Sequence, residues 1–170
     1  MTGFNHLRAS ADPMRWTQCP PPPPDIDDPC PGNLAYGLTL PSALVSPAIA
    51  RETAELVLDA HGFGDLSGAA LRVVHELAVY ACHFTPGGQD VHLTLCYRDH
   101  GLRIAVYDTH RPHTHPRLAE ACTNRRHAQL RDLLRLAETH EGAWGIETID
   151  YPGAATRTWF TLAHTPDEAV

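Results

Sequence analysis

A histidine and a glutamate stand side by side in the segment VVHELAVYACH, residues 73–83, and a second histidine ends it. A zinc-binding helix of the His-Glu-x-x-His type needs two histidines four residues apart, because side chains at that spacing share one helix face. Here Val79 stands at the second position, and His83 follows His75 by eight residues, roughly 12 Å along a helix. The spacing therefore predicts no metal site on this segment.

Three more histidines, His110, His113 and His115, lie close together in the segment HRPHTH. Imidazoles at this density could bind zinc or copper, or act as a switch that titrates at roughly pH 6.5. No cysteine or carboxylate has a fixed place beside them in the sequence, and the chain has 12 histidines in all, so that clusters arise by chance. From the sequence we therefore predict no dedicated metal site in this loop.

The elements that carry these residues follow from the spacing of apolar side chains. Apolar residues at helical spacing, with capping and breaking residues at the ends, predict three helices, at residues 46–61, 67–84 and 118–141. Alternating apolar and polar residues predict five strands, at residues 34–40, 91–99, 102–108, 143–151 and 156–164. A short turn at His100-Gly101 is expected to join two of these strands as a hairpin.

The order of these elements, β-α-α-β-β-α-β-β, indicates an α+β fold in which strands that follow one another pair as hairpins. We expect a two-layer α/β sandwich, in which a mixed, mostly antiparallel sheet of four or five strands is covered on one face by three helices. Each helix should turn an apolar stripe toward the sheet. For the first helix the expected stripe is Ile49, Thr53, Leu56, Val57 and Ala60.

Residues 1–33 differ in composition from the rest of the chain. Five consecutive prolines, Pro20 to Pro24, are followed by acidic residues, and proline lacks the N–H group that helices and sheets need. We predict a disordered, proline-rich tail over residues 1–33, with polyproline II character, and a domain over residues 34–170. Such a tail serves either as a stiff linker or as a docking ligand for an aromatic groove.

Charge and cysteine content argue against several classes of partner and compartment. The net charge is −7 and the basic residues are scattered, which argues against nucleic acid or an anionic membrane as the main partner. No apolar run approaches the ~20 residues needed to span a bilayer, and the N-terminus lacks an apolar signal segment. Five cysteines without a Cys-x-x-Cys pair indicate a reduced, cytoplasmic protein.

Three short motifs relate the chain to a known family. The second predicted helix carries ELAVYA at residues 76–81, the second hairpin strand ends in VYDTH with Asp108, and the last strand reads RTWFTL. In these motifs and in the order of its elements, the chain from about Leu40 to Leu162 resembles the histidine-kinase-like ATPase domains (GHKL type, Bergerat fold) of bacterial anti-sigma-factor serine kinases. The resemblance implies a Bergerat-like fold, ATP and magnesium as cofactors, and a sigma factor or an anti-sigma antagonist as protein partner. Proteins of this family commonly form homodimers.

The resemblance also implies roles for individual residues. Glu76 matches the glutamate that activates the attacking hydroxyl or water in the family, and Asp108 matches the aspartate that accepts a hydrogen bond from the adenine amino group. Tyr80 stands where the family has the asparagine that coordinates magnesium, and a phenol is a poor ligand for that ion. His110 replaces a glycine that lets the base approach, so its side chain would narrow the pocket.

The lid and the last strand differ from the family as well. The family's glycine-rich lid lets backbone N–H groups meet the phosphates, whereas this chain offers Arg131 followed by Asp132, whose negative charge would face a phosphate. Thr158, or Arg157 by a shift of one residue, matches the threonine of the final strand. The residues expected to bind a nucleotide, if that activity is retained, are Glu76, Tyr80, Asp108, His110, Arg131 and Thr158.

These departures favour a regulatory protein over an enzyme. We expect a pseudo-kinase that acts mainly by protein–protein binding, with ATP binding weakened or lost, because phosphoryl transfer depends on a positioned metal ion and on phosphate contacts. The alternative is an active ATP-dependent serine/threonine kinase, with Glu76 as its catalytic residue and an altered metal site.

Overall fold

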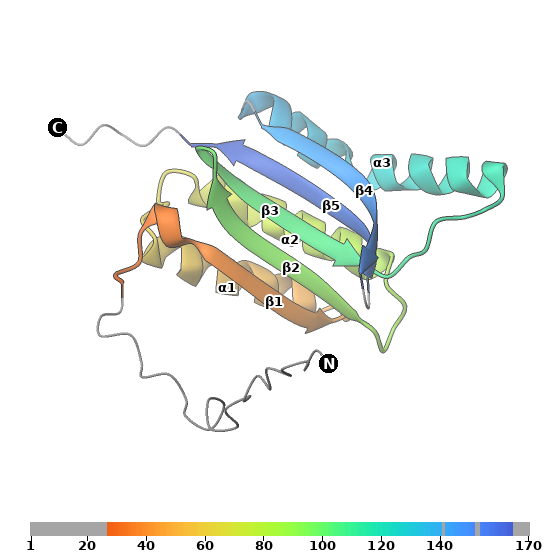
Figure 1. Ribbon diagram of the computed structural model, residues 1–170, viewed down its shortest axis with the longest axis horizontal. Coiled ribbons are helices and arrows are strands. Elements are labelled where there is room, and N and C mark those ends of the chain that lie inside the picture. The colour runs from red at the N-terminus through yellow and green to blue at the C-terminus, as the bar shows by residue number, and fades with distance from the viewer. Residues whose placement is uncertain (1–26, 141, 152–153, 165–170) are drawn as a thin grey trace, which may run out of the picture.

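The chain folds into one sheet with three helices packed on one face (Figure 1). The computed structural model describes residues 27–140, 142–151 and 154–164. Its strands are β1 (Ala35–Pro41), β2 (Asp90–Arg98), β3 (Gly101–Asp108), β4 (Ala143–Tyr151) and β5 (Ala154–Ala163). Its helices are α1 (Ser46–Ala60), α2 (Ser67–His83) and α3 (Pro116–Thr139).

The strand order is β1-β2-β3-β5-β4, and all four pairings among the described residues are antiparallel. The predicted α+β sandwich of five strands and three helices is therefore confirmed, with a sheet that is antiparallel throughout its described part rather than mixed. This order places β3 and β5 side by side at the centre of the sheet, so residues at the end of β3 lie beside the start of β5.

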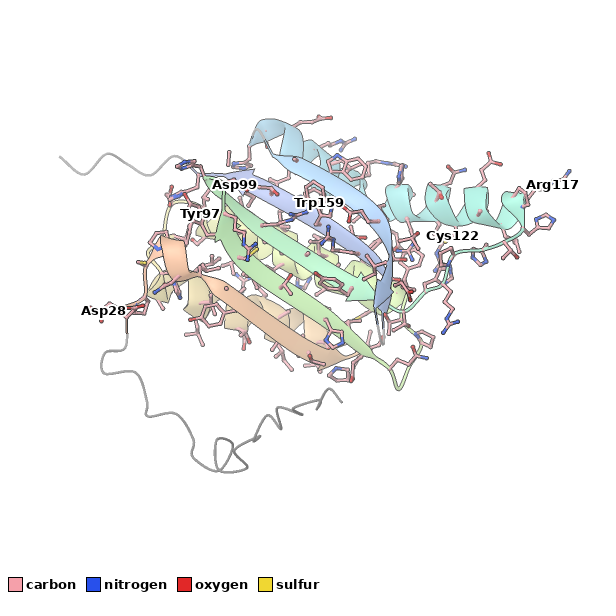
Figure 2. The ribbon with its side chains drawn as sticks, viewed as in Figure 1. Asp28, Tyr97, Asp99, Arg117, Cys122 and Trp159 are labelled. Carbon is pink, nitrogen blue, oxygen red and sulfur yellow. The ribbon has the colours of Figure 1, made fainter. Side chains whose placement is uncertain are left out.

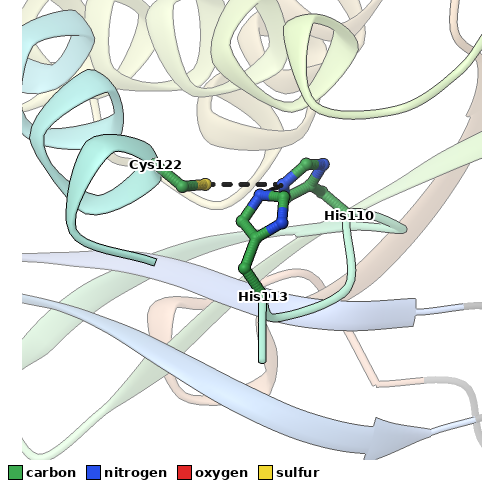
Figure 3. A group of neighbouring side chains, drawn as sticks. All are labelled: His110, His113 and Cys122. Atoms are coloured by element: carbon green, nitrogen blue, oxygen red, sulfur yellow. Dashed lines mark hydrogen bonds between the residues drawn. The ribbon is translucent and has the colours of Figure 1, made fainter. Parts of the chain in front are cut away.

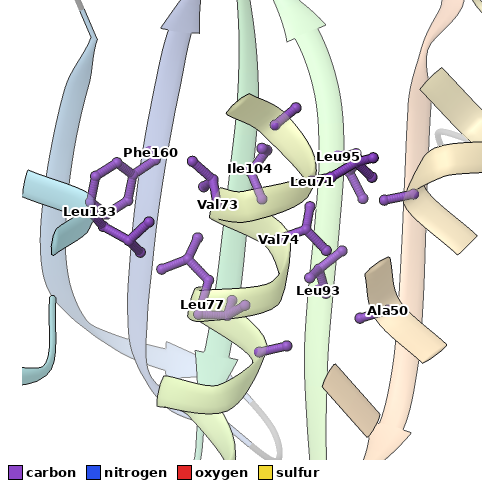
Figure 4. Close-up of a cluster of buried hydrophobic side chains, with 14 of the residues drawn as sticks. Ala50, Leu71, Val73, Val74, Leu77, Leu93, Leu95, Ile104, Leu133 and Phe160 are labelled. Carbon is purple, nitrogen blue, oxygen red and sulfur yellow. The ribbon is translucent and has the colours of Figure 1, made fainter. Parts of the chain in front are cut away.

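Helix α2 forms the middle of the core (Figure 4). Its apolar residues at helical spacing, among them Leu77, face inward as the sequence predicts and pack on the inner side of the sheet, where Ile104 and Phe160 lie. Helix α3 adds Leu133 to the same layer. Because α2 packs on the sheet by its apolar side, its rotation relative to the sheet is fixed, and with it the side that contacts the end of β3.

The expected buried stripe of α1 was wrong. The residues that α1 buries include Ala50, Ala54 and Leu58, whereas Ile49 is 40% exposed and Leu56 is 73% exposed. Apolar residues occur on two sides of this helix, and α1 packs chiefly against α2 through the side with the smaller residues. Alanines let two helices approach closely, which explains why this side was selected and why the larger side chains remain outside.

The hairpin between β2 and β3 turns at Asp99 and His100, one residue earlier than predicted. Both residues have positive φ angles, 51° and 58°. Two residues with positive φ form the turn that best matches the twist of paired strands. The turn fixes the register of β3 and with it the position of Asp108 at the far end of this strand.

The described chain begins shortly before β1. Residues Pro31–Asn33 form a short 3-10 helix, and the carbonyl oxygen of Cys30 lies 2.7 Å from Nδ1 of the buried His61. The prolines Pro20 to Pro24, on which the predicted tail rests, lie outside the described residues. Within the described part of the chain, no helix has the length and apolar character that crossing a membrane requires.

Candidate functional site

A buried ion pair joins the end of β3 to α3. Asp108 is fully buried, and the side chain of Arg126 is 7% exposed. The Arg126 guanidinium donates from Nη1 to Asp108 Oδ2 at 2.7 Å and from Nη2 to Asp108 Oδ1 at 3.0 Å. Two parallel hydrogen bonds of this kind fix the planar guanidinium against the carboxylate and are stronger than bonds between neutral groups.

Hydroxyl groups from α2 and β5 complete this network. Arg126 also donates from Nη1 to the phenolic oxygen of Tyr80 on α2, and Thr158 on β5 donates to the same oxygen at 3.2 Å. Thr156, two residues earlier on β5, accepts from Arg126 Nη2 at 3.4 Å. Buried polar groups require such partners, and here α2, α3, β3 and β5 each supply one or more members of the network.

Burial sets the electrostatics of this network. Burial alone would lower the pKa of Arg126, but the hydrogen bonds to Asp108 and the negative charge of that carboxylate outweigh it, so the pKa of Arg126 is raised. The guanidinium also lies over the ring of Phe84, with Cζ 4.1 Å from the ring centroid. Burial raises the pKa of the Tyr80 phenol. The network is therefore charged at its centre and neutral at its rim.

Asp108 has little capacity left to accept from a ligand. Its Oδ1 accepts from Arg126 and from the backbone N–H of His110 at 3.0 Å, and its Oδ2 accepts from Arg126. An adenine amino group could bind this carboxylate only after the guanidinium had moved away. Arg126 thus takes both carboxylate oxygens of Asp108, the residue that the sequence interpretation assigned to base recognition.

The structure brings four of the expected nucleotide-binding residues together and leaves two apart. Tyr80, Asp108, His110 and Thr158 are joined through the network just described. The other two, Glu76 on α2 and Arg131 on α3, have exposed side chains.

Asp132, expected near a lid, is also exposed and lies 3.6 Å from Arg135 within α3. From the sequence, Arg126 was considered only as a possible anion-binding residue beside Arg125 and Arg131, and its pairing with Asp108 was not predicted. A signal was available, because Arg126 precedes Leu130, Leu133 and Ala137 at spacings of four, three and four residues and so continues their buried stripe.

A pocket of about 300 Å³ lies beside the network, next to the loop between β3 and α3. Its lining includes Arg126, Thr156, His110, His113 and Cys122. In this pocket the side chains of His110 and His113 meet the thiol of Cys122 on α3 (Figure 3). Burial and the nearby charge of Arg126 lower the pKa of His110.

Sequence reasoning missed the contact of Cys122 with His110, because this cysteine lies twelve residues after His110 and reaches it only through the fold. His115, the third histidine of the predicted cluster, instead precedes the first residue of α3 and is exposed.

A larger hollow of about 670 Å³ lies elsewhere, over the face of the sheet that the helices leave open. Its lining includes His92, Tyr107 and Arg157. Trp159 lies on the same face (Figure 2) and donates to Glu147 at 2.8 Å. The network around Asp108 lies on the other face of the sheet. Groups with shifted pKa values cluster at functional sites, and Arg126, Tyr80 and His110 are such groups. We therefore take the Asp108 region as the candidate site.

Comparisons with known proteins leave the family open. No protein-family model matches this chain, and the curated proteins contain no match to it.

Proposed function

We propose that this protein is a regulatory protein of the anti-sigma-factor kinase type, which acts mainly by protein–protein binding and whose ATP binding is weakened or lost. The observation that carries the proposal is the buried pairing of Arg126 with both oxygens of Asp108. It concerns the residue that the resemblance assigns to adenine recognition.

Binding of a base to Asp108 first requires that this carboxylate be freed from its ion pair. A base that binds this carboxylate must displace a buried guanidinium, and breaking a buried ion pair costs about 3–5 kcal/mol. At about 1.4 kcal/mol for each factor of ten, this cost lowers affinity by about 140- to 3,700-fold. A nucleotide that would otherwise bind at micromolar concentration would then bind only above about 100 μM.

The residue at the expected magnesium position supports the same conclusion. The Tyr80 phenol stands at the position of the magnesium-binding asparagine, and its oxygen accepts from Arg126 and Thr158. An oxygen that is buried beside a guanidinium is a poor ligand for a divalent cation. Phosphoryl transfer depends on charge neutralisation by such a cation, so the exposed Glu76 has no metal-bound phosphate to act on.

An exposed apolar stripe on α1 supports the protein-binding part of the proposal. Val45, Ile49 and Leu56 are spaced by four and seven residues, lie on one side of the helix, and are 58%, 40% and 73% exposed. Leu44, just before them, is fully exposed. Contiguous exposed apolar residues mark protein interaction sites. The resemblance implies a sigma factor or an anti-sigma antagonist as the partner. A second copy of this chain could also bind the stripe, and self-association of the purified protein tests this.

The test is a calorimetric titration of the full chain with ATP, with and without magnesium. We expect a dissociation constant above about 100 μM and no strengthening by magnesium. Arg126→Gln should increase the affinity because it frees an oxygen of Asp108, whereas Arg125→Gln, which changes an exposed neighbour of the same type, should not. Low-micromolar, magnesium-dependent binding by the unsubstituted chain would overturn this proposal and favour the alternative, an active ATP-dependent serine/threonine kinase.

A further inference from the structure

Three metal-binding side chains converge at the edge of the pocket beside the candidate site. His110 Nε2 lies 3.1 Å from His113 Nε2, and Cys122 Sγ lies 3.4 Å from the same His110 nitrogen. All three ligand atoms lie within 4.8 Å of one another. The two histidines come from the loop after β3 and the cysteine from α3, so the fold brings the cluster together (Figure 3).

Two of these separations match the edges of a tetrahedron around a zinc ion. Zn–N bonds of about 2.0–2.1 Å and a Zn–S bond of about 2.3 Å place two nitrogens about 3.3 Å apart and a nitrogen about 3.6 Å from the sulfur. Two of the three edges already agree within about 0.2 Å. The third, between Cys122 and His113, needs to close by at most about 1.2 Å, which side-chain rotation can supply.

Hydrogen bonds alone cannot satisfy all three of these ligand atoms well. An imidazole nitrogen carries either one proton or one lone pair in the plane of its ring. His110 Nε2 is nevertheless in contact with both His113 and Cys122. It can therefore serve one of these partners well and the other only weakly. A cation placed among the three atoms would use one lone pair from each of them.

The position of His110 is fixed before any ion binds. Its backbone N–H donates to Asp108 at 3.0 Å, and its carbonyl oxygen accepts from Thr156 at 3.2 Å. Its ring packs edge-on against Phe84, with the centroids 5.7 Å apart. A ligand held by its backbone and by its ring loses little freedom on binding, which is what a preorganised site requires.

We propose that His110, His113 and Cys122 form a binding site for a divalent transition metal, Zn²⁺, with a fourth coordination position open toward the pocket of about 300 Å³. Two imidazoles and one thiolate suit this borderline-soft ion. Binding replaces the proton of the Cys122 thiol by the ion and releases that proton to solvent. Three protein ligands leave room for water or a small anion as the fourth. The proposal does not depend on the proposed regulatory function.

The test uses the full chain, freed of metal with a chelator. Titration with Zn²⁺ against a competing chromophoric chelator should give one ion per chain and a dissociation constant below about 1 μM. Co²⁺, used as a spectroscopic substitute, should give a thiolate-to-metal charge-transfer band and the intense visible bands of a tetrahedral site. Cys122→Ser should remove that band and weaken Zn²⁺ binding by at least about 100-fold.

Two matched controls separate this site from the other histidines and thiols of the chain. His115→Ala removes a histidine of the same loop and Cys96→Ser removes another free cysteine, and both variants should retain the wild-type affinity and spectrum. The proposal is overturned if the unsubstituted chain binds Zn²⁺ no more tightly than Cys122→Ser does. It is equally overturned if either control variant loses as much affinity as Cys122→Ser.

A second measurement uses only the unsubstituted chain and so does not depend on whether the variants fold. In the unsubstituted chain, Zn²⁺ should protect Cys122 from alkylation, while the exposed Cys30 should react at the same rate with and without the ion. Mass spectrometry of the peptides reports each thiol separately. Equal alkylation of Cys122 in both conditions would refute the site.

Discussion

The pairing of Asp108 with Arg126 predicts a strong non-additivity in stability. Asp108→Asn and Arg126→Met, made singly and together, test it. Asparagine keeps a side-chain oxygen that can still accept from the backbone N–H of His110, and methionine keeps apolar volume against Phe84. The substitutions therefore remove the charges while they preserve most of the other contacts.

The expected magnitudes follow from burial. Arg126→Met leaves the Asp108 side chain, which is 1% exposed, without its cation, and Asp108→Asn leaves the Arg126 side chain, which is 7% exposed, without its anion. Each single substitution should cost about 3–5 kcal/mol of unfolding free energy, because an isolated buried charge remains. The double variant leaves neither charge, so it should cost only about 1–2 kcal/mol. The coupling energy should then exceed about 3 kcal/mol. Substitutions at independent sites deviate from additivity by only about 0.3–0.5 kcal/mol.

Urea unfolding followed by circular dichroism measures these free energies. A domain of this size has a total stability of about 5–15 kcal/mol, so the single variants are best measured at low temperature and with the slope of the transition compared between variants. The matched control is Arg135→Met, which breaks the exposed pair with Asp132 in the same helix. That change should cost less than about 1 kcal/mol. A loss of less than about 1 kcal/mol for Arg126→Met, or costs that simply add in the double variant, would refute the reasoning.

Two further predictions concern the rim of the network and the surface of α1. Tyr80→Phe should cost about 1–3 kcal/mol in urea unfolding, because Arg126 and Thr158 lose an acceptor. Burial raises the pKa of Tyr80, so the stabilisation by the protonated phenol is complete below about pH 10 and declines as the pH rises further. The difference in unfolding free energy between the unsubstituted chain and Tyr80→Phe should therefore shrink above about pH 10. A constant difference up to pH ~11 would contradict this prediction. We expect the chain to self-associate through α1. In sedimentation velocity, Ile49→Asp with Leu56→Asp should abolish this self-association, whereas Leu118→Asp, at a site on α3 that is 56% exposed, should not. A monomeric unsubstituted chain would refute α1 as a dimer surface.

The fold followed from the sequence because its strands alternate clearly and its hairpin partners are close in the chain. Neighbouring strands need only short turns, so their pairing can be read from local patterns. The buried face of α1 could not be read in this way. Ile49 and Leu56 compete with Ala50 and Ala54 for the interior, and hydrophobicity favours the larger residues whereas close packing on α2 favours the alanines.

The candidate site was only partly accessible to sequence reasoning. Asp108 and Tyr80 stood out because they occupy motif positions, but the residue that joins them, Arg126, belongs to the helix that follows the polar loop 109–115. Contacts across such a loop depend on how α3 docks, which local patterns do not specify. The same limit applies to Cys122, whose distance in sequence from His110 concealed a contact of 3.4 Å.

The attachment of α3 explains why the ion pair and the proposed metal site occur together. The first buried side chain of α3 is Arg126, ten residues after the helix begins at Pro116, and the N-terminal half of the helix reaches beyond the edge of the sheet (Figure 1). Apolar burial therefore holds the second half of α3, while polar contacts hold the first half. Arg126 and Cys122 are four residues apart and share one side of the helix.

Arg126 reaches Asp108, and Cys122 reaches His110, whose backbone N–H is itself bound to Asp108. The buried charge network and the His-Cys cluster are thus two parts of one polar attachment. An ion bound at the cluster would act on the same half of α3 that the ion pair holds. Helix α2 is attached to the sheet by apolar packing, and it contacts this polar attachment through Tyr80, which accepts from Arg126.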